Sequence, residues 1–483
     1  MNIWFWVFIS YILINFFLMV SMIFFERKKL TSIISWMTVL TFLPWVGFLI
    51  YLIFGSGLSY RVRRLLHRYK LFDFEFDDKT KTYFKCDRTL TQKLKDDKDT
   101  IQCVTNYGSV LCPYNDIKIF LNGEDKINAL LKDIENAKKT INIEYYIFSD
   151  DATGKSVMNA LIKKAKEGVK VKLIFDSVGC LGAPRRFFKK LKKAGGEVKE
   201  FFPPFMYIRL FNLKMNYRNH KNRVVIDGKI GYTGGINIRD DHMGKKKKVS
   251  PWRDTHVRIT GSGVIPLQRL FLNDWRFVKN DKTPAEEYFK QKMFPKPSKT
   301  SGDACVQVIS SGPDAPIQEI KETYIKLITN AKKSILIQTP YFIPDEAFLT
   351  ALRIAIASGV KIKIMVPAKP DYKSIYYVTL SYLKDLIDLG VDIYLYNGFL
   401  HAKTLVVDDD KLSIGTCNLD NRSFQLNFED TVLIYSKKLN DQYTKVYEND
   451  IQNSVLADRA YFKKKRWLTK FLQAIFRLFA PIL

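Results

Sequence analysis

The sequence predicts an α/β protein in which two tandem α-β-α sandwich domains follow a transmembrane helical hairpin. Three observations lead to this fold class. Two long apolar runs occupy the N-terminal end, two segments of the first half recur in the second half, and each recurring segment contains a short apolar, β-branched run. With 483 residues the chain is long enough for several domains, each with a core of its own.

The hairpin is predicted from two uncharged apolar runs, Ile3 to Phe25 and Ser32 to Phe54. Each run is long enough to cross a hydrocarbon core of about 30 Å. A cleaved signal peptide is the alternative for the first run, but this run is too long and lacks a basic N-terminal region. Arginines and a lysine within residues 61–70 follow the second run, so the positive-inside rule predicts that both termini and the soluble body face the cytoplasm.

An internal repeat predicts the two domains. The segment from Ala137 to Phe148 recurs from Ala331 to Phe342, and the segment from Glu167 to Asp176 recurs from Ser358 to Pro367. Short β-branched runs that follow amphipathic helical stretches are typical of buried parallel strands. Each half is therefore expected to form its own layered α/β domain.

The predicted domain boundaries follow from these patterns. They are residues 1–58 for the hairpin, 59–107 for a basic juxtamembrane linker, 108–290 for the first domain, 291–305 for a linker, 306–460 for the second domain and 461–483 for an amphipathic basic helix. In the last segment, apolar residues spaced by three and four alternate with lysines and arginines, which favours a helix lying in the membrane plane. A helix packed on the body is the alternative.

Charge restricts the partners. The chain has 77 basic and 49 acidic residues and a net charge of +28, which suits either nucleic acid or an anionic membrane surface. Composition alone does not choose between them.

Two histidine motifs carry the predicted chemistry. His401, Lys403 and Asp408 form the pattern HxKxxxxD, and His220 and Asp227 repeat its frame in the first half. The asparagines that follow, Asn237 and Asn418, stand at the same distance from their histidines. A nucleophile or acid beside a cation suits phosphoryl transfer without a metal, and we find no magnesium cage or glycine-rich phosphate loop in the sequence. One such pair is usually an ordinary strand pair, but its double occurrence argues against that interpretation.

Further segments carry a family resemblance. They are PWVGFLIYLIFG at 44–55, GYTGGINI at 231–238, PWRDTHVRI at 251–259, SSGPD at 310–314, TPYFIP at 339–344 and RLFAPIL at 477–483. Together with the histidine motifs they resemble the phospholipase D superfamily and, within it, the bacterial cardiolipin synthases. The resemblance extends from about residue 30 to the C-terminus.

The resemblance implies two phospholipase D-like domains that pack face to face as a pseudo-dimer. It implies transfer of a phosphatidyl group between two phosphatidylglycerol molecules through a phosphohistidine, without a cofactor or metal, at a bacterial plasma membrane. By resemblance His220 is the nucleophile and His401 the acid and then the base, and the reverse assignment stays open. The partners are then anionic phospholipids and the membrane rather than nucleic acid.

The remaining site residues have expected roles. Lys403, Asn237 and Asn418 are expected to bind phosphate oxygens. Asp254 and Glu429 are expected to orient the histidines, with plain surface carboxylates as the alternative. The other predicted site residues are Asp227 and Asp408, expected to brace the turn after each strand, and Asn222 and Ser423, expected to contact the substrate.

One position departs from the family pattern. Asn222 stands where the family has a lysine, and the flanking Lys221 and Arg223 are expected to point to the opposite face of the strand. An amide brings no charge to the transition state. Three rival functions therefore stay open beside the synthase: a transferase or phospholipase D with another acceptor, a membrane-tethered nuclease, and a weakly active paralogue.

Overall fold

The computed structural model describes residues 3–25, 30–43, 46–51, 76, 78–203, 216–245, 250–283, 294–298, 300–464 and 467–480. The basic cluster within residues 61–70 and parts of both predicted linkers lie outside these residues. The family-like segments at 44–55 and 477–483 lie only partly within them.

The first half forms one layered unit. Its elements are β1 (Leu111–Phe120), α8 (Gly123–Asn136), β2 (Thr140–Tyr145), α9 (Ala152–Lys166), β3 (Lys170–Asp176), α10 (Arg185–Lys193), β4 (Glu197–Phe201), β5 (Arg218–Asn219), β6 (Asn222–Ile226), β7 (Ile230–Gly234), η5 (Asp240–Met243), β8 (Trp252–Arg253), β9 (His256–Gly261) and α11 (Val264–Lys279).

The second half repeats this order. Its elements are β10 (Ala304–Ser311), α13 (Glu319–Asn330), β11 (Ser334–Gln338), β12 (Phe342–Ile343), α14 (Glu346–Ala357), β13 (Lys361–Pro367), α15 (Lys373–Ile387), β14 (Asp392–Tyr396), β15 (Phe399–Leu400), β16 (Thr404–Val407), β17 (Lys411–Gly415), β18 (Leu419–Asp420), α16 (Asn421–Gln425), β19 (Asn427–Tyr435), α17 (Lys437–Gln452) and β20 (Ser454–Leu456).

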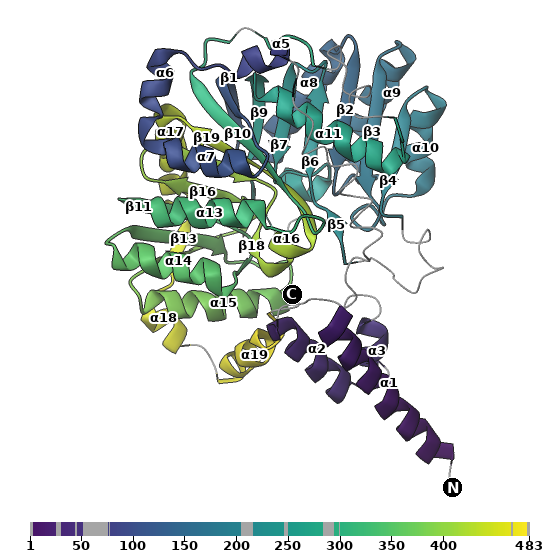
Figure 1. Cartoon of the computed structure of the whole chain (residues 1–483), viewed down its shortest axis with the longest axis vertical. Coiled ribbons are helices and arrows are strands. Elements are labelled where there is room, and N and C mark those ends of the chain that lie inside the picture. The colour runs from purple at the N-terminus through teal and green to yellow at the C-terminus, as the bar shows by residue number, and fades with distance from the viewer. Residues whose placement is uncertain are drawn as a thin grey trace.

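The strands of both halves join into one 16-stranded sheet within the described residues. From its outer edge inward the first half has the order β4-β3-β2-β6-β7-β9-β1. The second half has the matching order β14-β13-β11-β16-β17-β19-β10, with β20 added outside β14 at its edge. The two halves meet where β1 and β10 pair antiparallel. The predicted repeat is therefore also a repeat of topology, with a pseudo-two-fold axis near the centre of the sheet (Figure 1).

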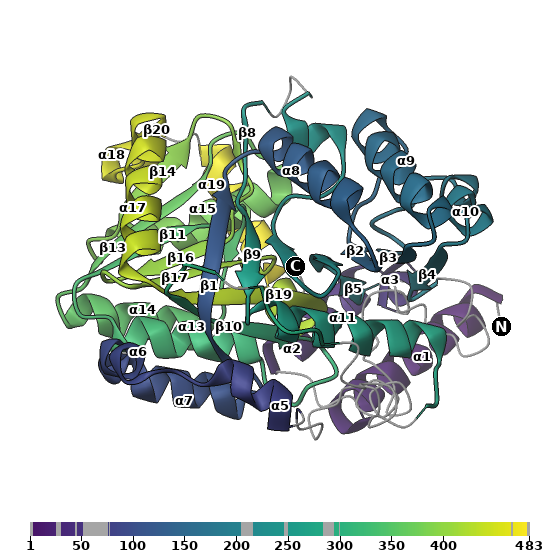
Figure 2. The same ribbon diagram turned by 90° about the horizontal axis from the view of Figure 1, so that it is seen from above.

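The three largest hydrophobic clusters of the described residues hold the layers together. One packs α8, α9 and α10 on the outer strands of the first half, and a second packs α13, α14 and α15 on those of the second half. A third core lies at the joint, where Val264 and Leu267 of α11 and Tyr443 and Tyr447 of α17 are buried with the inner strands. Seen from above, the inner strands β1, β9 and β19 lie at the middle between the two helical layers (Figure 2).

The N-terminal segment differs from a simple hairpin. Helix α1 spans Ile3–Phe25, but the second apolar run is divided into α2 (Leu30–Phe42) and α3 (Val46–Ile50). Pro44, which falls between the two helices in the sequence, lies outside the described residues. Within the described residues, we find no helix that is both long enough and apolar enough to span a membrane. The transmembrane hairpin is therefore not confirmed.

The short helices that precede β1 pack on the body. Residues 78–106, within the predicted juxtamembrane linker, form α5 (Asp78–Lys81), η2 (Thr82–Phe84), α6 (Arg88–Lys93), η3 (Lys95–Asp97) and α7 (Lys98–Asn106). Leu90, Leu94 and Val104 of these helices join the core of the second half.

The C-terminal region forms α18 (Arg459–Lys463) and α19 (Trp467–Arg477). Helix α19 packs on α15, with Phe476 stacked on Tyr377, and lies beside the N-terminal helices at one end of the molecule (Figure 1). The hydroxyl of Ser35 donates to the carbonyl of Leu478 at 3.3 Å.

Candidate active site

His220 is positioned by strands from both halves. It lies between β5 and β6, and because β5 pairs with β19, the His220 backbone N–H donates to the carbonyl of Phe428 at 2.9 Å. The next residue on β19 is Glu429, whose carboxylate oxygens lie 2.8 and 3.0 Å from His220 Nδ1. Thr416 and Asn427 donate to the same carboxylate at 2.5 and 3.1 Å. The first half thus supplies the imidazole and the second half its orienting carboxylate.

His401 repeats this arrangement in reverse. It follows β15, which pairs with β8, and its backbone N–H donates to the carbonyl of Arg253 at 2.7 Å. Asp254 comes next, and its Oδ2 lies 2.7 Å from His401 Nδ1. In each pair Nδ1–H donates to a carboxylate, which leaves Nε2 available for chemistry. The two carboxylates predicted as orienting groups therefore contact the histidines, each across the pseudo-two-fold axis.

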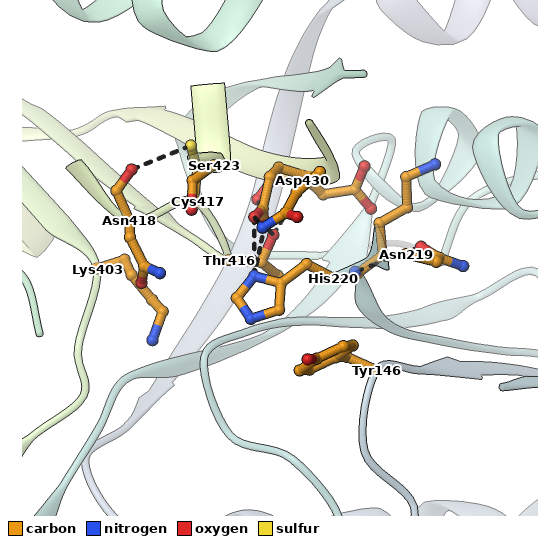
Figure 3. Close-up of polar contacts among 12 residues, drawn as sticks. Tyr146, Asn219, His220, Lys403, Thr416, Cys417, Asn418, Ser423 and Asp430 are labelled. Atoms are coloured by element: carbon orange, nitrogen blue, oxygen red, sulfur yellow. Dashed lines mark hydrogen bonds and ion pairs between the residues drawn. The ribbon is translucent and has the colours of Figure 1, made fainter. Parts of the chain in front are cut away.

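Both histidines open into one cleft of about 510 Å³ between the halves. Figure 3 shows the neighbourhood of His220, with Tyr146 below its ring and Lys403 and Asn418 on one side. The Tyr146 and His220 rings meet edge to face with their centroids 4.7 Å apart. The cleft is lined by Tyr146, Ile147, Arg218, His220, Asn237, Arg239, Asp241, His242, Trp252, Tyr341, Ile343, Pro370, Asp371, Tyr372, Ile375, Phe399, His401, Asn418, Asp420, Arg422, Ser423 and Asn427.

Lys403 brings a buried positive charge beside the cleft. Its Nζ donates to the carbonyl of His401 at 2.6 Å. Burial lowers the pKa of Lys403 from its ordinary 10.5 to about 8, although Asp254 and Glu429 act in the opposite direction. Burial and then the charge of Lys403 lower the pKa of His401 to about 3. At neutral pH the site thus holds a charged lysine beside a neutral imidazole.

Asn222 occupies the position that corresponds to Lys403, and its side-chain amide forms hydrogen bonds with backbone groups. Its Oδ1 accepts the N–H of Tyr146 at 3.3 Å, and its Nδ2 donates to the carbonyl of Gly234 at 3.2 Å. The side chain is buried and is not among the groups that line the cleft. At this position the structure places a structural amide instead of a cation.

The charged neighbours of Asn222 point away from the cleft. Lys221 pairs with Asp274 at 2.7 Å, and Arg223 pairs with Asp430 at 2.5 Å. Both cations are buried, and the pair of Arg223 with Asp430 of β19 is fully buried and crosses between the two halves. Neither cation therefore substitutes for the missing lysine.

The motif aspartates lie at the other end of their strands. Asp227 accepts the backbone N–H groups of residues 138, 139 and 140 at 2.7–2.8 Å. Asp408 accepts those of residues 332, 333 and 334 at 2.7–3.1 Å. Both have a positive φ, 53° and 52°, in the left-handed region that aspartate tolerates in tight turns. Neither lines the cleft.

Three predicted binding residues do line the cleft. Asn237 Oδ1 accepts the N–H of Ile147 at 3.1 Å, and its Nδ2 donates to the carbonyl of Gly235 at 3.4 Å. Asn418 Oδ1 and Ser423 Oγ are buried and have no hydrogen-bond partner within the described residues. Buried polar groups are normally paired, so these two atoms suit contact with a ligand.

A third histidine, which the sequence did not single out, lies next to Asp254. His242 Nδ1 is 3.6 Å from Asp254 Oδ2, and the His242 ring is 5.2 Å from that of His401, centroid to centroid. His242, Asp254 and His401 bring atoms of metal-ligand type within 4.8 Å of one another. Asp254 and His401 are already close because they form a histidine–carboxylate hydrogen bond, so their closeness by itself does not indicate a metal site.

The residues that sequence reasoning missed come mainly from corresponding positions of the two halves. Phe399 pairs with Trp252 beside His401, and Arg218 pairs with Asn427 beside His220. Aligning the two repeats from their histidines would have matched Arg218 with Phe399, since each precedes its histidine by two positions. No pattern among neighbouring residues in the sequence indicates the contacts between the two halves.

Comparison with known proteins adds a family match. The sequence model described as "Cardiolipin synthase, PLD-like domain" matches residues 130–248 and 324–451, which coincide with the two repeats. The major cardiolipin synthase ClsA of Bacillus subtilis is 39% identical over 482 residues, which cover 98% of each chain. The cardiolipin synthase of Listeria innocua is 40% identical and also covers 98% of each chain. That of Staphylococcus aureus is 39% identical and covers 99% of this chain and 96% of its own.

A solved structure matches at the level of fold. The phosphatidylserine synthase of Haemophilus influenzae superposes with a TM-score of 0.60 at 16% identity and covers 80% of this chain and 98% of its own. At this identity the likeness shows the two-domain α/β fold alone.

Proposed function

Because the chain belongs to the cardiolipin synthase family, we propose that it transfers a phosphatidyl group from one phosphatidylglycerol to another, forming cardiolipin and glycerol. The observation that carries the proposal is the pair of histidine–carboxylate contacts that open into one cleft. Two imidazoles with free Nε2 atoms are what a two-step phosphoryl transfer requires, one as nucleophile and one as acid and base.

In the first step we assign His220 as the nucleophile. Glu429 holds the Nδ1 proton, so the lone pair of Nε2 attacks phosphorus. The bond from phosphorus to the glycerol oxygen breaks, and the departing oxygen takes a proton from His401 Nε2. The products of this step are free glycerol and phosphatidyl-His220.

His401 must carry a proton when the first step begins. Burial and the charge of Lys403 by themselves lower the pKa of His401 to about 3. An anionic phosphate between the histidines offsets the charge of Lys403 and so raises the pKa of His401. The acid is therefore protonated together with substrate binding, and it is neutral again after the first step.

In the second step the neutral His401 acts as the base. It takes the proton from a glycerol hydroxyl of a second phosphatidylglycerol, and the oxygen attacks phosphorus. The bond between phosphorus and His220 Nε2 breaks, and its electron pair returns to the imidazole. Lys403, Asn237 and Asn418 are proposed to stabilise the charge on the phosphoryl oxygens in both steps.

We also propose that the N-terminal helices and α19 hold the body at a bacterial plasma membrane, with the body on the cytoplasmic side. Exposed apolar side chains on both elements support this, among them Trp4 and Phe17 on α1 and Trp467 and Phe471 on α19. Protease and thiol-labelling accessibility in sealed vesicles of known orientation tests the topology. A body reached only from the outside would contradict it.

The function is tested with the purified full-length protein in vesicles of isotope-labelled phosphatidylglycerol. Mass spectrometry of the products should show cardiolipin and glycerol in equal amounts, and acid-labile label should appear on His220. Cardiolipin without labelled His220 would overturn the mechanism. A protein inert on phosphatidylglycerol but active with another acceptor, or on DNA, would overturn the substrate.

A further inference from the structure

The two ends of the cleft occupy corresponding places in the two halves but differ in chemistry. Beside His220, Arg218 of β5 pairs with Asn427 of β19. Beside His401, the same two positions hold Phe399 of β15 and Trp252 of β8. All four residues line the cleft. At this pair of positions the pseudo-two-fold site is therefore polar and cationic beside His220 and aromatic beside His401.

The aromatic end surrounds the His401 ring. We call Trp252, Phe399 and His242 the aromatic wall. The ring centroid of His401 lies 5.3 Å from that of Trp252, 5.8 Å from that of Phe399 and 5.2 Å from that of His242. Trp252 also contacts both other members of the wall, at 4.8 Å from Phe399 and 4.2 Å from His242. Phe399 is fully buried, so the wall leaves little room for solvent on its side of His401.

In the proposed reaction, the surroundings of His401 determine which hydroxyl group attacks the phosphohistidine. The acceptor hydroxyl must approach His401, and water competes for the same position at a far higher concentration. Attack by water on phosphatidyl-His220 would yield phosphatidic acid, because oxygen from water replaces the imidazole on phosphorus and His401 takes the proton. A synthase therefore needs a reason why a lipid hydroxyl reacts in preference to water.

We propose that the aromatic wall determines the acceptor, favouring a carbon-bearing alcohol over water at His401. Its rings exclude ordered water and pack against the carbon atoms of the acceptor's glycerol, which water lacks. The polar side chains at the His220 end do not have this property, since the guanidinium of Arg218 and the amide of Asn427 are groups able to hydrogen-bond water. This inference rests on the proposed function and adds the residues that separate transfer from hydrolysis.

The test measures the ratio of phosphatidic acid to cardiolipin, because a general loss of activity would lower both products and leave this ratio unchanged. The variants Trp252→Asn, which installs the residue of the corresponding position, and Phe399→Leu are compared with the wild type in phosphatidylglycerol vesicles. The ratio of phosphatidic acid to cardiolipin should rise by about tenfold in Trp252→Asn, which corresponds to about 1.4 kcal/mol of lost discrimination. Ile354→Asn on the exposed face of α14, away from the cleft, is the control, and its ratio should equal that of the wild type.

Two further measurements separate this role from a structural one. Trp252→Phe keeps an aromatic ring and should restore the ratio. Phosphatidyl-enzyme prepared without excess lipid should decay faster in buffer when Trp252 is Asn than in the wild type. Variants that lose both products in proportion, with unchanged decay, would overturn the proposal. A wild type that forms neither product from phosphatidylglycerol would instead overturn the proposed function itself.

Discussion

Replacing Lys403 by methionine should make the protein more stable and less active. Methionine has a similar length but no charge. The side chain of Lys403 is buried beside the catalytic cleft, and burial lowers its pKa from 10.5 to about 8. The folded protein therefore keeps this ammonium charged at a cost in stability. Such a cost is typical of groups whose charge is needed for function.

The magnitude follows from the pKa. One pKa unit corresponds to about 1.36 kcal/mol, so the lowered pKa costs about 3 kcal/mol at neutral pH. Methionine also removes the hydrogen bond from Nζ to the carbonyl of His401, which offsets about 1 kcal/mol of the gain. A net stabilisation of about 2 kcal/mol is expected below pH 8. It should shrink between pH 8 and 10.5, because the folded lysine becomes neutral first and the unfolded lysine later.

The chemical step should respond in the opposite direction. Loss of one charge-assisted contact to a developing phosphoryl charge slows such a step by about a hundredfold to a thousandfold. The assays are thermal unfolding in detergent at pH 6 and pH 9.5, and single-turnover cardiolipin formation in vesicles. Lower stability of Lys403→Met at pH 6 combined with an unchanged rate would refute the reasoning, because Lys403 would then be a structural cation.

Lys221→Met is the matched control for this prediction. Lys221 is also buried, but burial is outweighed by its pair with Asp274, so the pKa of Lys221 is raised. A raised lysine pKa contributes stability that is present below the unfolded pKa and lost as the pH rises through the folded value. Removing Lys221 takes one charged hydrogen-bond partner from Asp274, which is partly exposed and keeps its contact with Arg223, so the protein should be destabilised by about 2 kcal/mol at neutral pH. The two lysines should thus give opposite shifts.

The remaining predictions concern the rest of the site. His220→Ala and His401→Ala should each abolish cardiolipin formation, and near-normal turnover by either would exclude the two-histidine mechanism. Glu429→Gln should keep phosphatidylglycerol binding but lower the rate by about a hundredfold or more, as misoriented histidines do elsewhere; equal rates in stopped-flow experiments would contradict this. Asn222→Lys should speed single-turnover phosphohistidine formation by less than the roughly hundredfold of a full charged contact, because it also removes the partner of the Tyr146 N–H. A slower variant would mean that the amide itself is needed. Chelators should leave activity unchanged, and a loss that Mg²⁺ restores would show a metal requirement.

Local sequence patterns were sufficient for the repeat and the histidines. Strands β2 and β11, and β3 and β13, lie where the recurring segments predicted them, because β-branched periodicity is a property of neighbouring residues. The family resemblance stated from the motifs is confirmed by the match over both repeats and by relatives about 40% identical. The α/β class and the two phospholipase D-like domains are confirmed with it.

The tertiary structure decided which groups act together. Glu429 is separated from His220 by 209 positions, and Asp254 from His401 by 147, so no local pattern could pair them. They meet because β5 joins β19 and β15 joins β8 across the pseudo-two-fold axis. The hydrogen bonds of Asn222 with backbone groups could not be predicted either, since the residue type does not reveal whether an amide faces a ligand or a main-chain group. The sequence by itself determined which chemical groups the site contains, because each group is the side chain of a single residue. Only the fold determined which groups contact one another, because these contacts depend on strand pairing between distant segments.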